Sequence, residues 1–444
     1  MNLHRLLCQR AEAGRPVRVG LIGCGKFGTM FLAQARLTPG LHVLGIADLN
    51  PERVRRSLEG AGWPEEQLAA GGFAEALASG QTHLTDDASA LIGASGLDVL
   101  VEATGDPRAG LRHALAAIEQ GRHLVMVNVE ADVLVGPLLA ERARKAGLVY
   151  SLAYGDQPAL ICELVDSVRA SGFPVVCAGK GTRYMPHFHE STPATVWTHY
   201  GITAEQAEAA GMNPKMFNSF IDGTKSSIEM AAVANATGLT PQAKGLGFPP
   251  CGTDDLPYVL RPEADGGQLE HEGTVEVVSD RERDGRPVQR HLRWGVYVTF
   301  AAPTDYARAC FAQYGLTVDP SGRVAALYRP VHMIGLELGI SVASAALRGE
   351  PTGCPRGFRA DVIATAKRDL GPGEVLDGEG GEMVWGRLVP AKTSIAEEGL
   401  PIGLAHGVKL TRRITAGTRL SLADVALDPD DEAFRLRQSM IAAL

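Results

Sequence analysis

Short apolar runs alternate with amphipathic helical segments along the first 158 residues of the chain. The apolar runs fall within 17–23, 40–48, 96–107, 124–136 and 148–158, and each reads as a strand that ends in a polar turn. Helical patterns lie between them, including 109–123, which ends at Gly121, and a segment that we expect to begin at Pro137. Strands that alternate with helices are typical of a parallel, doubly wound sheet. The sequence therefore predicts an α/β fold that begins with a Rossmann domain.

The first strand leads into glycines in G-x-G-x-x-G spacing, Gly23, Gly25 and Gly28, within "VGLIGCGKFGTM". The first glycine permits a tight turn, the second lets the backbone approach a pyrophosphate, and the third lets helix and strand pack closely. A helix from Lys26 to Leu37 would then direct its N–H groups at the phosphates. We expect the loop, with Lys26 and Phe27, to bind a dinucleotide.

The second strand ends at Asp48, twenty residues after Gly28. A carboxylate at this place accepts hydrogen bonds from the adenosine ribose and repels a 2′-phosphate, so NAD is favoured over NADP. Three arginines follow in a helical pattern and are interpreted as a solvated face: Arg53, Arg55 and Arg56.

Ligands of doubly wound sheets bind beyond the carboxyl ends of the strands. The loops after Ile22, Ala47, Ala103 and Val127 should therefore gather around the cofactor. These loops add Thr104, Gly105 and Asn128 to the expected cofactor-binding residues.

Composition narrows the classes of partner. The formal net charge of −8 and pI of about 5.9 argue against nucleic acid and anionic membranes, and leave room for a local basic pocket that takes a small anionic substrate. The seven cysteines form no C-x-x-C pair, which favours reduced thiols in the cytoplasm. No signal peptide and no apolar run of membrane-spanning length is expected.

From about residue 156 the alternation ends and a second, α+β domain is expected. Its most informative stretch is "DGTKSSIEMAAVANATG", where a helix would place Asp222, Lys225 and Glu229 on one face. The apolar neighbours suggest burial, and buried charges are paired or functional. A salt-bridged solvent face is the alternative.

Other polar residues of this region are further candidates. Lys180 ends the strand "VVCAGK" and could hold a substrate oxygen, or could be a loop lysine in solvent. Arg329 and His332 precede an apolar helix expected to carry Glu337. His187, His189 and Glu190 form a weak metal-binding pattern, so the metal requirement stays open, with a divalent ion admitted.

Residues 351–444 contain short strands joined by glycine turns, as in "LGPGEVLDG" and "ITAGTRLSL". This pattern predicts a small β-rich domain with no catalytic cluster, serving as a cap or an oligomerisation surface.

Several motifs together resemble a known family. They are "VRVGLIGCGKFGTMF", "GIADLNP", "VEATGDP", "NVEADVLVGP", "YGDQP", "DGTKSSIEMAAVANATG" and "YRPVHMIGLE". They are similar to the reductoisomerase-like oxidoreductases, which look like homoserine dehydrogenase in their first two domains and end in a SAF domain. The group includes enzymes like 1-deoxy-D-xylulose 5-phosphate reductoisomerase, of bacterial isoprenoid biosynthesis, and the apionate oxidoisomerases of carbohydrate breakdown.

The resemblance implies three domains: 1–155 for the dinucleotide, 156–350 for catalysis and dimerisation, and 351–444 as the SAF module. It implies a homodimer or higher oligomer that couples hydride transfer to isomerisation of the carbon skeleton of a sugar phosphate or sugar acid. The residues expected to move protons and hold oxygens are Lys180, Asp222, Lys225, Glu229 and His332. The alternatives are a simple alcohol dehydrogenase like homoserine dehydrogenase and a non-catalytic NAD(P)-binding sensor.

Overall fold

The computed structural model describes residues 2–443, which form two compact units. Of the described residues, the first unit contains 2–160 and 333–355, and the second contains 161–332 and 356–443. The segment 333–350, which the sequence assigns to the central domain, thus packs with the first unit, as does 351–355 from the start of the predicted tail, and the rest of the tail shares a unit with the central region. The division into three domains stays a prediction.

The first unit is built on a six-stranded parallel sheet in the order β3-β2-β1-β4-β5-β6, as a Rossmann fold requires. Its strands are β1 (Val17–Ile22), β2 (Leu41–Ala47), β3 (His83–Thr85), β4 (Val99–Glu102), β5 (His123–Met126) and β6 (Tyr150–Leu152). Its helices are α1 (Leu3–Glu12), α2 (Lys26–Ala35), α3 (Pro51–Gly60), α4 (Phe73–Ser79), α5 (Ala88–Gly93), α6 (Pro107–Glu119), α7 (Val129–Lys145) and α15 (Gly339–Arg348).

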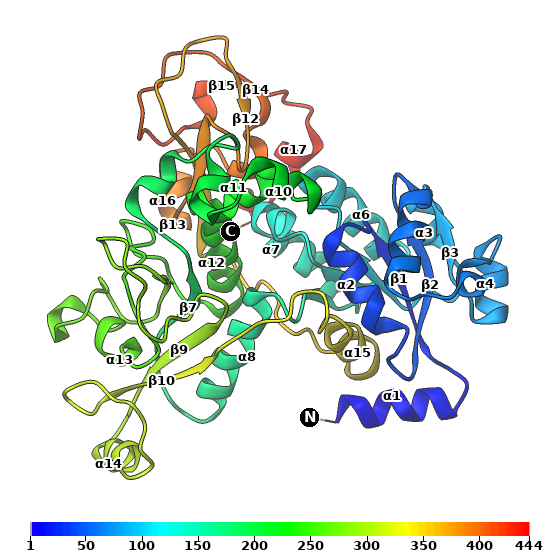
Figure 1. The fold of residues 1–444 in the computed structure, drawn as a ribbon, viewed down its shortest axis with the longest axis horizontal. Coiled ribbons are helices and arrows are strands. Elements are labelled where there is room, and N and C mark those ends of the chain that lie inside the picture. Colours follow the sequence, from blue (N-terminus) through cyan, green and yellow to red (C-terminus); the bar gives the residue numbers. More distant parts are fainter. Residues whose placement is uncertain (1, 444) are drawn as a thin grey trace. The chain divides into compact units, whose positions relative to one another are not determined.

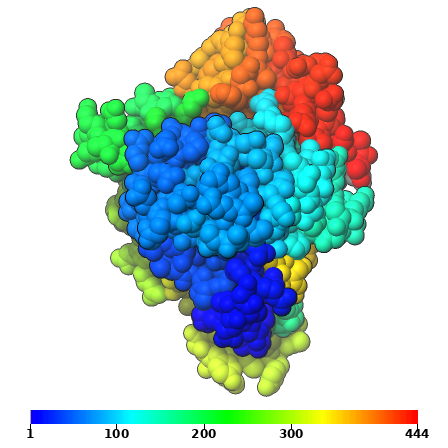
Figure 2. Space-filling view, turned by 90° about the vertical axis from the view of Figure 1, so that its right-hand side faces the viewer, coloured from blue at the N-terminus to red at the C-terminus, as the bar shows by residue number. Residues whose placement is uncertain are grey.

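The core of this unit lies between the sheet and its helices. Strands β1 and β4 are almost wholly buried because they are central in a parallel sheet. Helix α15 returns from far along the chain to pack on the sheet and on α1. In Figure 2 the dark-blue α1 lies on the surface of the first unit. The short edge strand β3 has no counterpart in the sequence prediction, since its three residues are too few to show a period.

The expected start of a helix at Pro137 is wrong. Helix α7 begins at Val129 with Asn128 as its N-cap, and Pro137 lies inside it. An interior proline costs roughly 3 kcal/mol. The eight residues that precede it include Val133 and Val135, both buried, and each such side chain contributes about 1.5–3 kcal/mol. Burial therefore outweighs the proline.

The second unit contains a mixed four-stranded sheet in the order β10-β9-β7-β8 and two small antiparallel sheets, β11-β13 and β12-β14-β15. The strands are β7 (Val175–Thr182), β8 (Thr274–Ser279), β9 (Val296–Ala301), β10 (Val324–Arg329), β11 (Ala360–Ala366), β12 (Val375–Asp377), β13 (Val384–Pro390), β14 (His406–Leu410) and β15 (Val425–Ala426). The helices are α9 (Val196–Tyr200), α10 (Ala204–Ala209), α11 (Pro214–Asp222), α12 (Thr224–Thr237), α13 (Leu256–Val259), α14 (Asp305–Gln313), α16 (Ala391–Ala396) and α17 (Glu432–Ala442). Helix α8 (Gln157–Ala170) carries the chain from one unit into the other.

Helix α12 is the centre of the second unit (Figure 1). It packs on β7 and β8 of the mixed sheet and on β11 and β13 of the tail. Twelve of its fourteen residues are buried, so it shows no clear polar face. The tail strands therefore cover a helix that the central region cannot bury alone.

None of the helices in the described part of the chain combines the length and the apolar character needed to cross a membrane.

Candidate functional site

The three glycines after β1 have different structural reasons. Gly23 has φ of 87°, and a Cβ there would lie 2.6 Å from the carbonyl oxygen of Ala103. A Cβ on Gly28 would lie 2.8 Å from the carbonyl oxygen of Gly23. Packing therefore demands the first and third glycines. A Cβ on Gly25 would meet nothing within 4 Å and its φ is −79°, so the fold itself does not require this glycine.

The open space at Gly25 lies at the start of α2. Gly25 is the N-cap residue, and no side chain caps the helix. The first N–H groups of α2, those of Lys26 and Phe27, therefore lie beside a position where any side chain larger than hydrogen would project into open space. A helix N-terminus of this kind favours an anionic group. The arrangement suits the pyrophosphate of a dinucleotide.

Asp48 lies directly after β2 and contacts the same loop. Its Oδ2 accepts a hydrogen bond of 2.8 Å from the Cys24 amide, and its Oδ1 accepts one of 3.0 Å from the Asn50 amide. Arg53 donates from Nη2 to both oxygens at 2.9 Å. Burial acts against ionisation of Asp48, but these hydrogen bonds outweigh it and hold the pKa below its usual value. The carboxylate is therefore ionised and braces the glycine-rich loop.

Two of the three arginines of α3, Arg53 and Arg56, are exposed as the solvated-face interpretation expects. Arg55 is half-buried and donates to the carbonyl oxygen of Leu68 at 3.2 Å, and Arg53 also pairs with Asp48. Asn50 caps α3 by accepting from the Arg53 amide. A cation thus lies beside the carboxylate from which the NAD preference is predicted.

Strand β4 ends in a buried acid that the sequence interpretation missed. Glu102 is fully buried, and its Oε1 accepts from the Thr104 hydroxyl at 2.6 Å and bonds His113 Nδ1 at 3.2 Å. Among the described residues, its Oε2 has no hydrogen-bond partner. Gly105 follows with φ of 73°. The motif "VEATGDP" contains the signal, since an acid at the end of a buried strand needs a partner.

Asn128 is buried and already engaged within the protein. Its Oδ1 accepts from the Ala131 amide at 3.1 Å and its amide nitrogen donates to the carbonyl oxygen of Asp106 at 2.8 Å. Its side chain therefore joins the loops after β4 and β5. That it also binds the cofactor stays a prediction, as do the cofactor roles of Thr104 and Gly105.

In the second unit, Lys180 and Glu229 form a buried ion pair. Lys180 lies near the end of β7, is 4% exposed, and reaches Glu229 on α12, which is 2% exposed. The alternative of a solvent-exposed lysine at 180 does not hold. A buried pair of this kind gains Coulomb energy but loses the hydration of both ions, so it is weak evidence of stability and a candidate for function.

The expectation that one helical face carries Asp222, Lys225 and Glu229 is wrong. Gly223, with φ of 90°, ends α11 at Asp222, and α12 begins at Thr224. The left-handed glycine breaks the pattern that the residue spacing suggested. Lys225 and Glu229 do share α12 at i and i+4, and Lys225 is half-buried in its first turn.

Asp222 is instead bound by a residue of the tail. Lys367, directly after β11, donates from Nζ to Asp222 Oδ2, to the carbonyl oxygen of Ser191 and to that of Gly381, each at 2.7 Å. Asp222 Oδ1 accepts from the Thr224 amide at 2.8 Å. Burial raises the pKa of Asp222, although Lys367 and Thr224 act to lower it. No local pattern in the sequence identifies Lys367, which lies 145 residues from its partner.

Of the histidines, His189 lies beside Asp222. His189 bonds the Tyr184 hydroxyl through Nε2 at 2.9 Å and the carbonyl oxygen of Asp222 through Nδ1 at 2.7 Å. Burial lowers its pKa to about 4, so it is neutral and both ring nitrogens are occupied. His332 is half-buried and bonds the carbonyl oxygen of Trp294 at 2.7 Å. Glu337 precedes α15 rather than lying within it.

No group of three or more His, Cys, Asp or Glu side chains within residues 2–443 is placed to hold a metal ion.

Residues 155–338 match the family model of the catalytic domain of the oxidoreductase DRL. The match contains Lys180, Asp222, Lys225, Glu229 and His332. This central part of the chain is therefore similar to an oxidoreductase catalytic domain. No curated protein sequence matches the chain.

Solved structures align with parts of the chain at low similarity. Myo-inositol dehydrogenase from Lactobacillus casei is 13% identical over 41% of this chain and 50% of its own, with a TM-score of 0.30. Biliverdin reductase from Synechocystis sp. PCC 6803 is 17% identical over 38% and 48%, with a TM-score of 0.27. A probable dehydrogenase from Thermotoga maritima is 13% identical over 75% and 90%, with a TM-score of 0.39. The chain spans about half the length of the first two, and scores this low carry no functional argument.

Proposed function

We propose that the chain is an NAD(P)-dependent oxidoreductase that acts on a small, hydroxylated anionic substrate. The observation that carries the proposal is the buried Lys180–Glu229 pair within the segment that matches an oxidoreductase catalytic domain. The first unit supports it with a Rossmann sheet whose Gly25 is left open at an uncapped helix N-terminus. A dinucleotide fits these residues because its pyrophosphate needs both features.

The bound nicotinamide would supply or accept a hydride at the substrate carbon. In the oxidative direction the substrate hydroxyl loses its proton and the carbon loses hydride, so an alcohol becomes a ketone. Lys180 would hold the oxygen and exchange its proton, and Glu229 would orient the ammonium and receive or return that proton. Because both side chains are almost fully buried from solvent, water would screen their charges only weakly from the substrate.

A finer proposal concerns the substrate and the coupled step. The motif resemblance favours isomerisation of the carbon skeleton of a sugar phosphate or sugar acid, and a homodimer. The ion pair also suits this step, because moving a carbon–carbon bond to a ketone carbon requires a polarised carbonyl oxygen and a base at the neighbouring hydroxyl. Asp48 favours NAD over NADP, although Arg53 beside it reduces the repulsion of a 2′-phosphate.

The test is a screen of sugar acids and sugar phosphates with NAD(H) and NADP(H), followed by nicotinamide absorbance. Lys180→Met should lower turnover by about 10²-fold or more, the usual scale for a lost acid–base or electrostatic group. It should leave NADH binding within about twofold. Lys392→Met, at an exposed position of α16, is the control for loss of one lysine charge.

Two results would contradict the proposal. NADH binding without turnover of any substrate would favour a sensor. Normal turnover in Lys180→Met would show that the ion pair is structural. Carbon NMR of the product separates the finer alternatives, because a simple alcohol dehydrogenase keeps the carbon skeleton and an isomerising enzyme changes it.

A further inference from the structure

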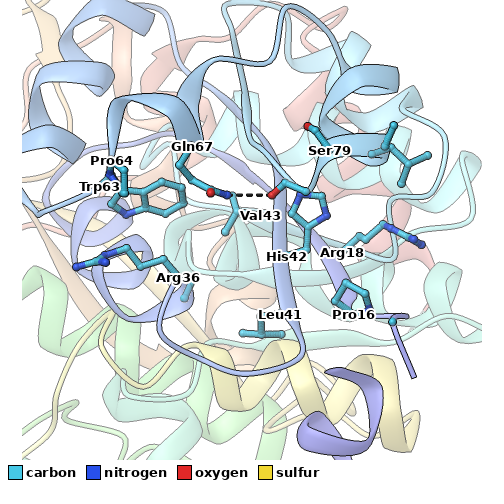
Figure 3. Close-up of a pocket in the computed structure, with 15 residues that line it drawn as sticks. Pro16, Arg18, Arg36, Leu41, His42, Val43, Trp63, Pro64, Gln67 and Ser79 are labelled. Atoms are coloured by element: carbon cyan, nitrogen blue, oxygen red, sulfur yellow. Dashed lines mark hydrogen bonds between the residues drawn. The ribbon is translucent and has the colours of Figure 1, made fainter. Parts of the chain in front are cut away.

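The first unit contains a cavity of about 630 Å³ at the amino ends of β1 and β2. Its lining includes Pro16 and Arg18 from the start of β1 and residues 41–43 from the start of β2. The ends of α2 and α4 contribute Arg36 and Ser79, and Trp63 and Gln67 come from the segment after α3 (Figure 3). Arg18 and Gly23 lie five residues apart along β1, about 17 Å at 3.3 Å per residue. The cavity is therefore separate from the carboxyl ends of the strands.

The charge of the lining is opposite to that of the chain. The fifteen residues around the cavity include two arginines, Arg18 and Arg36, and no Asp or Glu. The whole chain carries a net charge of −8. A concave lining whose charged residues are all cationic, on an acidic protein, favours anions.

Of the two arginines, Arg18 is the better candidate to bind an anion. Its Nε is buried and has no hydrogen-bond partner within the described part of the chain, although a buried guanidinium donor ordinarily has one. His42, beside it in the cavity, is held by the carbonyl oxygen of Gln81 at 2.8 Å. Burial lowers the pKa of His42 and Arg18 lowers it further, which outweighs the opposite effect of the hydrogen bond to Gln81, so the imidazole is neutral and adds no charge to the lining.

The shape of the cavity fixes where a ligand would lie. Arg18 and Arg36 extend toward opposite ends of the view in Figure 3; His42 and Val43 lie between them, and Trp63 lies beside Arg36. Arg36 is exposed, whereas Val43 and Trp63 are buried. One end thus offers the partly buried guanidinium of Arg18, and the rest of the lining includes apolar and aromatic side chains. The volume is within the range of small-molecule sites.

We propose that this cavity is a second ligand site of the Rossmann unit, which binds a small organic anion with its carboxylate or phosphate at Arg18 and its uncharged body against Val43 and Trp63. The anionic group of the ligand would accept a hydrogen bond from Arg18 Nε, and its uncharged body would pack against the apolar side chains of the lining. Helix α2 and strands β1 and β2 join this site to the glycine-rich loop, since each has one end at the cavity and the other at the loop.

The proposal is tested by calorimetric titration of the full chain with phenyl phosphate, in excess NAD⁺ so that the dinucleotide site is filled. Saturable binding of one equivalent is expected. Benzyl alcohol, which has the ring without the charge, should bind at least tenfold more weakly. A carboxylate probe of the same size, phenylacetate, separates phosphate recognition from general anion binding.

Variants locate the binding. Arg18→Met should weaken phenyl phosphate at least tenfold, and Ala78→Trp, which fills the cavity from an exposed position, should do the same without touching Arg18. Arg56→Met removes one exposed arginine elsewhere in the unit and should change affinity less than twofold. The proposal fails if no saturable binding occurs, if NAD⁺ competes with phenyl phosphate, or if both cavity variants bind normally.

Discussion

Removing the ammonium of Lys367 should destabilise the second unit strongly. In Lys367→Met the buried Asp222 loses its only ion-pair partner in the described chain. The carbonyl oxygens of Ser191 and Gly381 lose one donor and keep the Asn218 amide. Removing one partner of a buried pair typically costs about 3–5 kcal/mol, because the other charge stays buried without compensation. For a unit of this size that corresponds to a fall in Tm of roughly 10 °C.

The assay is equilibrium unfolding in urea followed by circular dichroism, with thermal melts alongside. Lys409→Met is the matched control, because Lys409 is an exposed lysine of the same tail and its loss should change stability by less than about 0.5 kcal/mol. The double variant Asp222→Asn with Lys367→Met should recover part of the loss, since no charge then stays buried. A loss below about 1 kcal/mol in Lys367→Met alone would refute the reasoning.

Three further predictions concern the first unit. Gly25→Ala should leave the melting temperature nearly unchanged, but it should weaken NADH binding in a fluorescence titration. Gly28→Ala should lower the melting temperature, because its Cβ would clash with the backbone. Equal melting temperatures of the two variants would contradict the steric argument. Asp48→Ala should narrow the affinity gap between NADH and NADPH, and a wild-type preference for NADPH would contradict the assigned role. Burial raises the pKa of Asp132 to about 7, so the folded state holds a proton that the unfolded state releases and stability should fall as pH rises from about 4 to 7. Asp132→Asn should flatten that slope in urea titrations at pH 5 and 8, while a slope equal to wild type would exclude Asp132 as its source.

The sequence by itself determined the Rossmann unit. Local signals suffice there, because parallel strands buried on both faces read as continuous apolar runs and the turn after β1 needs glycine at 23 and 28. The same signals placed Asp48 at the end of β2. They also placed Lys180 at a strand end and Glu229 on a buried helix, although they did not join the two.

Only the tertiary structure decided which charges pair. Lys180 meets Glu229 because α12 packs on β7, and Asp222 meets Lys367 because the tail packs on the same helix. Each pairing depends on contacts between segments far apart in the chain, which no local periodicity encodes. Burial in the tertiary structure also explains why α7 continues past Pro137. The left-handed conformation of Gly223 ends α11 at Asp222, so Asp222 does not belong to the helix that contains Lys225 and Glu229. The pair of Arg53 with Asp48 is a local contact, because the two residues lie five positions apart and Asn50 caps the helix between them.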